Sequence, residues 1–301
     1  MKKIILVSLS FFLFAFSSFA SEKYNLRING KSHNFYNKVF SNNLVGCGDK
    51  QYQKGTREFA SVLYLTGNDF KIEGGIFDCS LQNTIFVKRA KNLVIENVTS
   101  SRGSDNPLEI RNSYVFVRNS TFKDSVTNKC VETENGIVIF YRNTFSNCRN
   151  GHDMELTKPG YAVSVFLENR FIKIKDDGFN CWVRGTHGNY FLFLKNNTFS
   201  GQAGETFRKF GKRISCKNVF QIPKELEDSI KANNHIESFK IIKKIISLNI
   251  NEKIFNSLSL NNRKLIQTNL INFGYNSTID GIWGKRTSSA VQKFVEIKKL
   301  E

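Results

Sequence analysis

Three glutamates recur at a fixed interval in the middle of the chain. Glu109, Glu132 and Glu155 follow one another at intervals of 23 residues. Each stands between two residues that suit the buried side of a strand, and alternate residues of a strand point to opposite sides of a sheet. In strands stacked about 4.8 Å apart, the three carboxylates would form one outward row. Like charges at that spacing repel, so the row requires a cation, a shared proton or a function.

Carboxylates in such a row could cleave a polysaccharide. Neighbouring carboxylates could lie near the ~5–5.5 Å separation of a retaining glycosidase, and one skipped strand would bring a pair nearer the ~6.5–9.5 Å of an inverting enzyme. In a lyase the carboxylates would hold Ca²⁺, and an arginine or lysine would remove the α-proton of a uronate. The residues predicted for catalysis are Glu132, Glu155, Asp153, Asp177 and Arg184.

Other residues around the row suit sugar binding. The indole of Trp182 could stack on a sugar ring, and Arg208 could hold an anionic substituent. The residues predicted to bind substrate are Glu109, Trp182, Arg208, His152 and His187. Trp283, near the C-terminus, could stack on a sugar or belong to the core of its domain.

No cofactor is required by this chemistry, although Ca²⁺ is compatible with it. The carboxylates that could hold Ca²⁺ are Glu132, Asp153 and Glu155. The alternative interpretation of the row is a solvated sheet face, in which Glu109 lies beside Arg111 and weak ion pairs offset the charges.

A repeat indicates how these residues are positioned. A short apolar strand is followed by Asn, one residue and Phe, and the phenylalanines of the repeat are Phe122, Phe145, Phe171, Phe199 and Phe220. Strands of this length, with no helix between them, can bury a core only by stacking. We therefore predict a parallel β-helix in which the Phe turns inward and the Asn forms a corner or a ladder between coils. The apolar pairs predicted to face inward are Val115/Val117, Ile137/Ile139, Val163/Val165 and Phe191/Phe193.

This stretch resembles the right-handed parallel β-helix superfamily that includes pectate lyases and polygalacturonases. The resemblance covers a little over half of the chain and implies the fold and a polysaccharide-active face. Asp176-Asp177 is similar to the paired aspartates of polygalacturonases. The other sequence signatures of polygalacturonases and the Asp-His signature of pectate lyases do not occur. The activity therefore stays open between a polysaccharide lyase, a glycoside hydrolase and no catalysis.

The N-terminal residues have the pattern of an export signal. Lys2 and Lys3 precede an apolar run from Ile4 to Phe16, and Ser18-Phe19-Ala20 suits signal cleavage. We expect an exported chain that is not an integral membrane protein after cleavage. The six cysteines could then form disulfides or stay unpaired in the core, and the sequence leaves both open.

The C-terminal residues carry a second pattern. Gln267 precedes Gly274-Tyr275, the run Asp280-Gly-Ile-Trp-Gly284 follows, and Thr287 precedes Ala290-Val291 and Phe294. This set resembles the small helical peptidoglycan-binding domain of bacterial wall-acting proteins. The resemblance implies cell-wall binding. Asp280, Gly281 and Thr287 suit structural roles, since the Asp and Thr can cap and the Gly permits a turn.

Together these features predict a mainly β chain with a small all-α C-terminal domain. The predicted division is a signal peptide over 1–20, a right-handed parallel β-helix over 21–221, a helical cap or linker over 222–258 and a peptidoglycan-binding-like domain over 259–301. The formal charge of +18 favours an anionic partner, and export argues against nucleic acid.

We expect a bacterial envelope protein, periplasmic, wall-associated or secreted, that binds peptidoglycan or another anionic polysaccharide through its C-terminal domain. Its β-helix would act on or bind a polysaccharide. The alternative is a non-catalytic structural or adhesive wall-binding protein.

Overall fold

The structure is a computed structural model. It describes residues 26–41, 61–125, 128–156, 161–183, 189–201, 207–209, 219–248, 255–256, 260–272 and 276–291. The predicted signal peptide, Arg184 and His187 lie outside the described residues.

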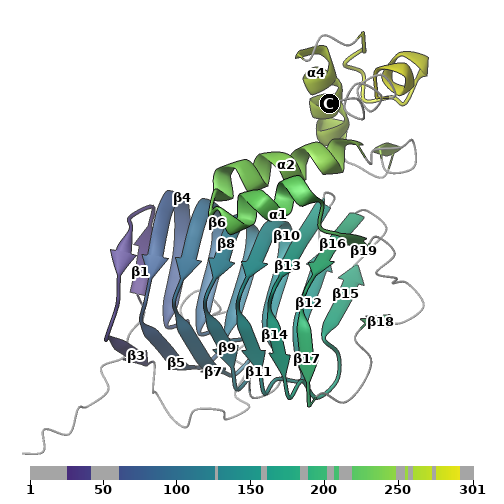
Figure 1. The fold of residues 1–301 in the computed structure, drawn as a ribbon. Coiled ribbons are helices and arrows are strands. Elements are labelled where there is room, and N and C mark those ends of the chain that lie inside the picture. The colour runs from purple at the N-terminus through teal and green to yellow at the C-terminus, as the bar shows by residue number, and fades with distance from the viewer. Residues whose placement is uncertain are drawn as a thin grey trace, which may run out of the picture.

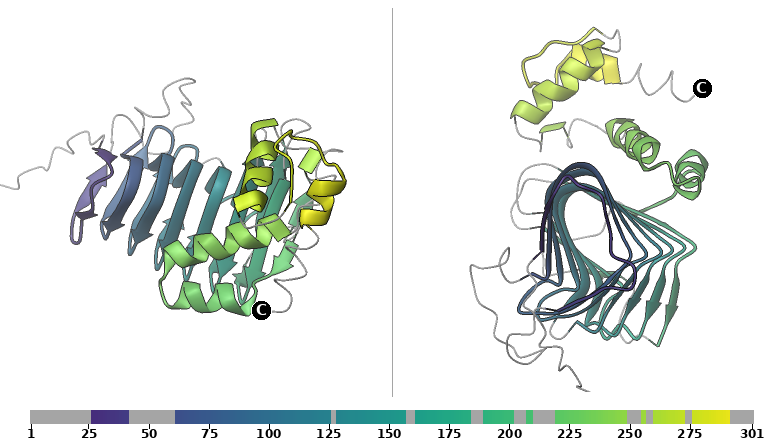
Figure 2. Two further views of the ribbon diagram at one scale, coloured as in Figure 1. Left: turned by 90° about the horizontal axis from the view of Figure 1, so that it is seen from above. Right: turned by 90° about the vertical axis from the view of Figure 1, so that its left-hand side faces the viewer.

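Residues 63–221 form a parallel β-solenoid of about six turns (Figure 1), which confirms the predicted fold class. Its coils lie one behind another around a common axis (Figure 2, right). The larger sheet consists of β1 (Leu26–Asn29), β2 (His33–Asn34), β4 (Leu63–Glu73), β6 (Ile85–Glu96), β8 (Leu108–Arg118), β10 (Lys129–Tyr141), β12 (Asn150–Leu156), β13 (Tyr161–Leu167), β15 (Phe179–Val183), β16 (Asn189–Lys195), β18 (Phe207–Lys209) and β19 (Val219–Gln221). The smaller sheet consists of β3 (Val39–Ser41), β5 (Ile76–Ser80), β7 (Thr99–Gly103), β9 (Thr121–Lys123), β11 (Thr144–Ser146), β14 (Arg170–Ile172) and β17 (Thr198–Ser200).

The larger sheet bends, so each coil has three sides. The long strands β6, β8 and β10 cross the bend. The first half of β10 pairs with β12, whereas its second half pairs with β13. We call the side built from β12, β15 and the first halves of β8 and β10 the first side. The second halves, with β13, β16 and β19, form the second side, and the smaller sheet forms the third.

Phenylalanines stack through the interior, as the repeat predicted. The rings of Phe122, Phe145, Phe171 and Phe199 follow one another with centroids 5.8, 4.9 and 4.8 Å apart. Phe220 does not continue this column, because it lies opposite Phe193 on the second side. The Asn-x-Phe spacing in the sequence therefore predicted the wrong position for Phe220.

The recurring asparagines form the predicted ladder between coils. The Asn143 amide donates to Asn169 Oδ1 at 3.1 Å, and the Asn169 amide donates to Asn197 Oδ1 at 3.0 Å. The left-handed corner falls on the preceding residue, with φ of 55° at Arg142 and 57° at Glu168. The ladder and the left-handed corner are thus adjacent positions of one repeat.

Helices cover the outer surface of the second side. They are α1 (Lys224–Lys231) and α2 (His235–Leu248), and α4 (Leu260–Asn272) follows in the C-terminal part. Leu226, Ile230 and Ile242 pack with Ile139 and Phe193 of the strands, so α1 and α2 lie along the side of the solenoid (Figure 1). The segment predicted as a helical cap or linker over 222–258 thus begins with two helices that cover a side of the solenoid.

The packing of these helices shows that three of the four pairs predicted to face inward face outward instead. Val115 and Val117 belong to the interior core. The members of the other three pairs point outward to the helices, namely Ile137, Ile139, Val163, Val165, Phe191 and Phe193. Both surfaces of this side are apolar, so alternation along the strand does not reveal which one faces inward.

Disulfides hold cysteines of the solenoid. Cys130, at the start of β10, is bonded to Cys148, which follows β11. Cys79 and Cys181 are also disulfide-bonded, so no cysteine in the part of the chain that the structure describes has a free thiol. Cys47 and Cys216 lie outside that part.

Removing one rung of the ladder tests its contribution. Asn169→Ala removes the donor to Phe140 O and Asn197 Oδ1 and leaves the buried backbone N–H of Asn143 without its acceptor. We expect the free energy of unfolding in urea to fall by about 2–3 kcal/mol. Asn34→Ala, at an exposed position of β2, should change it by less than about 1 kcal/mol. Equal losses in the two variants would contradict a special role of the ladder.

Candidate functional site

One outward row of the first side carries acidic and amide side chains. Glu109 of β8 lies opposite Glu132 of β10, which lies opposite Asp153 of β12, which lies opposite Asn180 of β15. We call these four residues the acidic row. The sequence predicted Glu155 at the third position, but Glu155 lies opposite Glu134.

The physical reason for this correction is a shorter coil. Glu132 and Asp153 are 21 residues apart rather than 23. A shift of two residues keeps every side chain on its own side of the sheet. The alternation of apolar and polar residues therefore fitted the wrong register as well as the right one.

The acidic row is buried. Glu109 is 0% exposed, Glu132 3%, Asp153 5% and Asn180 1%. This burial contradicts the interpretation of the row as a solvated sheet face. Buried carboxylates are costly unless cations or hydrogen bonds compensate them.

Two cations bridge neighbouring carboxylates. Lys129 Nζ lies 2.8 Å from Glu132 Oε2 and 3.2 Å from Asp153 Oδ2. Arg111 contacts Glu109 within its own strand and lies 3.0 Å from Glu134 of the next coil. Both cations thereby offset the repulsion between stacked coils.

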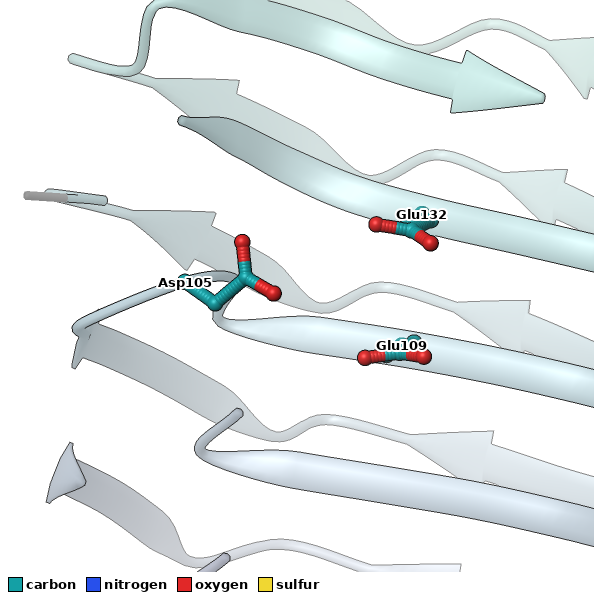
Figure 3. A group of neighbouring side chains, drawn as sticks. All are labelled: Asp105, Glu109 and Glu132. Atoms are coloured by element: carbon teal, nitrogen blue, oxygen red, sulfur yellow. The ribbon is translucent and has the colours of Figure 1, made fainter. Parts of the chain in front are cut away.

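Neutral side chains and Asp105 border the row at one end. The Asn83 amide donates to Glu109 Oε2, and the Asn106 amide donates to Asn83 Oδ1 at 3.1 Å and to Glu132 Oε2 at 3.2 Å. Asp105 precedes β8 at the turn and lies beside Glu109 and Glu132 (Figure 3). Each of these three acids offers a carboxylate oxygen, and the three oxygens lie within 4.8 Å of one another.

Burial and charge move the pKa values of the site in a defined way. Burial raises the pKa of Asp153, and the neighbouring Lys129 only partly offsets this. Burial alone would lower the pKa of Lys129, but the charges of Glu132 and Asp153 outweigh it and hold the pKa above its ordinary value. Lys129 is therefore an ammonium ion at neutral pH, and Asp153 binds a proton more readily than an ordinary aspartate.

The structure brings some of the other predicted site residues near the row. Glu155 is buried on the same side of the sheet, close enough that its charge raises the pKa of Lys129. Asp177 is buried next to β12, and its backbone N–H lies 3.4 Å from Asn150 Oδ1. Trp182 of β15 lies opposite Glu155, and Arg208 of β18 lies opposite Asn180. The side chains of Trp182 and Arg208 lie outside the part of the chain that the structure describes.

His152 does not lie on this surface, contrary to its predicted place beside the row. It faces the interior, where its ring contacts Phe166 with centroids 4.8 Å apart. Its Nε2 lies 2.9 Å from Thr133 Oγ1. His152 precedes the outward residue Asp153 and lies opposite the inward residue Val131, so the alternation along β12 turns it inward.

Sequence reasoning missed a second row except for Asp177, and this row lies three residues before the first. It consists of Asn83, Asn106, Lys129, Asn150 and Asp177. Each precedes an inward residue of its strand by two positions, as Lys129 precedes Val131. The intervals of 23 residues from Asn83 to Asn106 and from Asn106 to Lys129 were a readable signal. These residues lie before the apolar pairs that mark the strands, so the alternation within the strands does not include them.

A different polar network organises the C-terminal residues. The buried Gln267 of α4 donates to Asp280 Oδ1 at 2.8 Å and to Thr287 Oγ1 at 3.0 Å, and its own Oε1 accepts from Gly281 N at 2.7 Å. Gly281 has φ of 76°, a conformation that other residues rarely adopt. One glutamine thus holds together the whole loop before the helix at 285–291.

Trp283 belongs to the packing of this region. It is partly buried and contacts the ring of Phe255, with centroids 5.2 Å apart. Its prediction as a sugar-binding residue is not tested by this contact.

Residues 259–299 match the family described as "Putative peptidoglycan binding domain". The chain carries a peptidoglycan-binding domain. This confirms the resemblance read from Gln267, the Asp280 to Gly284 loop and Thr287. The match associates the protein with the cell wall. A comparison with curated proteins finds no match. None of the helices within the described ranges is long and apolar enough to cross a membrane.

The buried histidine gives the fold a pH dependence. Burial lowers the pKa of His152 to about 3, from an ordinary 6.5. Between those pH values the unfolded chain binds a proton that the folded chain does not, so stability falls as the pH falls below about 6.5. We expect His152→Gln to reduce the slope of unfolding free energy against pH by about 1.4 kcal/mol per pH unit between pH 6 and 4.

Urea unfolding of the two proteins at several pH values measures this slope. The exposed His33 of β2 provides the control, since His33→Gln should leave the slope unchanged. The same slope in wild type and His152→Gln would contradict a neutral buried histidine.

Proposed function

We propose that this protein is exported to the bacterial envelope, binds peptidoglycan through its C-terminal domain and binds or cleaves a polysaccharide at the acidic row of its solenoid. The observation that carries the proposal is the family match at 259–299 on a chain whose residues 63–221 form a β-solenoid. A rigid solenoid fixed to the wall would hold its polysaccharide site at a constant place among the wall polymers.

The chemistry of the acidic row suits proton transfer to a glycosidic oxygen. A general acid must hold its proton near neutral pH, which requires a raised pKa. Burial raises the pKa of Asp153, which is the direction that a general acid requires. Glu132, paired with Lys129, is the neighbouring carboxylate that would act as base or nucleophile. Lys129 itself is a poor base, because its pKa is raised, and this makes a hydrolase a better proposal than a lyase that uses Lys129.

A non-catalytic wall-binding protein is the second candidate. The burial of Glu109, Glu132 and Asp153 favours it, because a catalytic carboxylate must be reached by its substrate. In that case the paired charges hold the coils together, and the solenoid is a structural or adhesive arm.

Sedimentation with purified sacculi tests the wall-binding part. Wild type should pellet with sacculi, and Gln267→Ala should bind them at least about tenfold more weakly, because the loop at Asp280 and Gly281 loses its central hydrogen bonds. Glu73→Gln, at a partly exposed glutamate of the solenoid outside the row, serves as the control and should pellet like wild type. Failure of the wild-type protein to pellet would refute peptidoglycan binding.

Product release tests the catalytic part separately. Wild type incubated with sacculi and with uronate polysaccharides should yield new reducing ends. Glu132→Gln and Asp153→Asn should each lower the rate about 100-fold or more, as expected for loss of an acid or base. Glu73→Gln, at a partly exposed glutamate outside the row, should retain the rate. Absence of product from every glycan, with sacculus binding intact, would favour the non-catalytic candidate.

A further inference from the structure

A small group of oxygen atoms lies where two coils meet at the end of the acidic row. Asp105 comes from the turn before β8, Glu109 from β8 itself and Glu132 from β10 of the next coil (Figure 3). All three are buried, and one carboxylate oxygen from each lies within 4.8 Å of the other two. An acidic cluster alone is a common feature, so the neighbouring uncharged groups are what identify a ligand.

Asn106 supplies an independent indication. It is 0% exposed, and its Oδ1 has no hydrogen-bond partner. The orientation of the amide is fixed, because its nitrogen donates to Glu132 Oε2 and Asn83 Oδ1. The amide thus contacts the Glu132 carboxylate through its nitrogen, and its carbonyl oxygen is a buried, unsatisfied acceptor. A buried acceptor of this kind is costly unless it finds a donor or a cation.

A second amide of the same row has the same property. Both side-chain atoms of Asn180 are buried without a hydrogen-bond partner. Asn180 lies opposite Asp153, which Lys129 connects to Glu132. Unsatisfied polar groups thus lie near both ends of the acidic row.

We propose that Asp105, Glu109, Glu132 and Asn106 bind one Ca²⁺ ion that links two neighbouring coils. The donor atoms are all oxygens, which select a hard cation over zinc. This set replaces the sequence-based expectation of Glu132, Asp153 and Glu155, because Asp153 is paired with Lys129 and Glu155 lies in another row.

The spacing of the oxygens is compatible with a calcium ion. Calcium–oxygen distances of about 2.3–2.6 Å place ligands on opposite sides of the ion about 4.6–5.2 Å apart. The three carboxylate oxygens, which lie within 4.8 Å of one another, fall inside that span. Magnesium demands a stricter octahedral geometry and gives up its water less readily, so a site of protein oxygens favours Ca²⁺.

The neighbouring cations are compatible with a bound ion. Lys129 contacts Glu132, and Arg111 contacts Glu109. Each carboxylate oxygen has more than one lone pair, so it can face a side-chain donor and a metal ion together. Lys129 and Arg111 would orient the ligands, and carboxylates binding through both oxygens, or water, would complete the six to eight contacts that Ca²⁺ takes.

Calorimetric titration of the EDTA-treated protein with CaCl₂ tests this inference. We expect one Ca²⁺ per chain, weaker binding of Mg²⁺ and a higher melting temperature in CaCl₂ than in EDTA. Asp105→Asn should weaken Ca²⁺ binding about tenfold or more, and so should Asn106→Leu, which removes the carbonyl without adding charge. Asp78→Asn is the matched control, because Asp78 pairs with Arg102 away from the site, and it should bind like wild type.

Failure of the folded wild type to bind millimolar Ca²⁺ would overturn the inference. Unchanged binding in both Asp105→Asn and Asn106→Leu, with folding verified by circular dichroism, would also overturn it. If Asp105→Asn does not fold, the result for Asn106→Leu decides. Because no glycan enters the titration, its outcome is independent of sacculus binding and product release.

Discussion

Each coil of this solenoid must match the next one at a spacing of about 4.8 Å, and the rest of the molecule depends on that constraint. Every side chain has an equivalent directly above and below it. Phenylalanines satisfy the constraint by stacking, as Phe145 does with Phe171. Asparagines satisfy it by donating to the next asparagine, as Asn143 does to Asn169. A residue that suits one coil is therefore favoured again in the next, and this is the origin of the repeat.

The same constraint makes the acidic row unusual. Glu109, Glu132 and Asp153 place like charges in register and out of contact with water. The molecule offsets this by inserting Lys129 and Arg111 between the coils, which turns repulsion into alternating attraction. Such an arrangement is stable only when every partner is present. That is why the row is both the best candidate for chemistry and a structural element of the solenoid.

The rest of the molecule is stabilised without buried charges in register. The outer surface of the second side is apolar, and α1 and α2 cover it with Leu226, Ile230 and Ile242. The wall-binding domain is organised on its own polar centre, where Gln267 holds the loop of Asp280 and Gly281. The chain thus joins two units with separate folding principles: stacking of equivalent residues, and one buried glutamine.

The sequence by itself determined the solenoid, the asparagine ladder and the peptidoglycan-binding pattern, because each depends on residues that recur or lie close together in the chain. It could not determine the register after Glu132, since a shift of two residues leaves the alternation unchanged. It also could not show that Ile137 and Ile139 face helices while Val115 and Val117 face the interior, because both surfaces are apolar. Only the tertiary structure decided that Asp153 rather than Glu155 lies beside Glu132, and that Lys129 lies between them, since those neighbours come from different coils whose lengths are unequal.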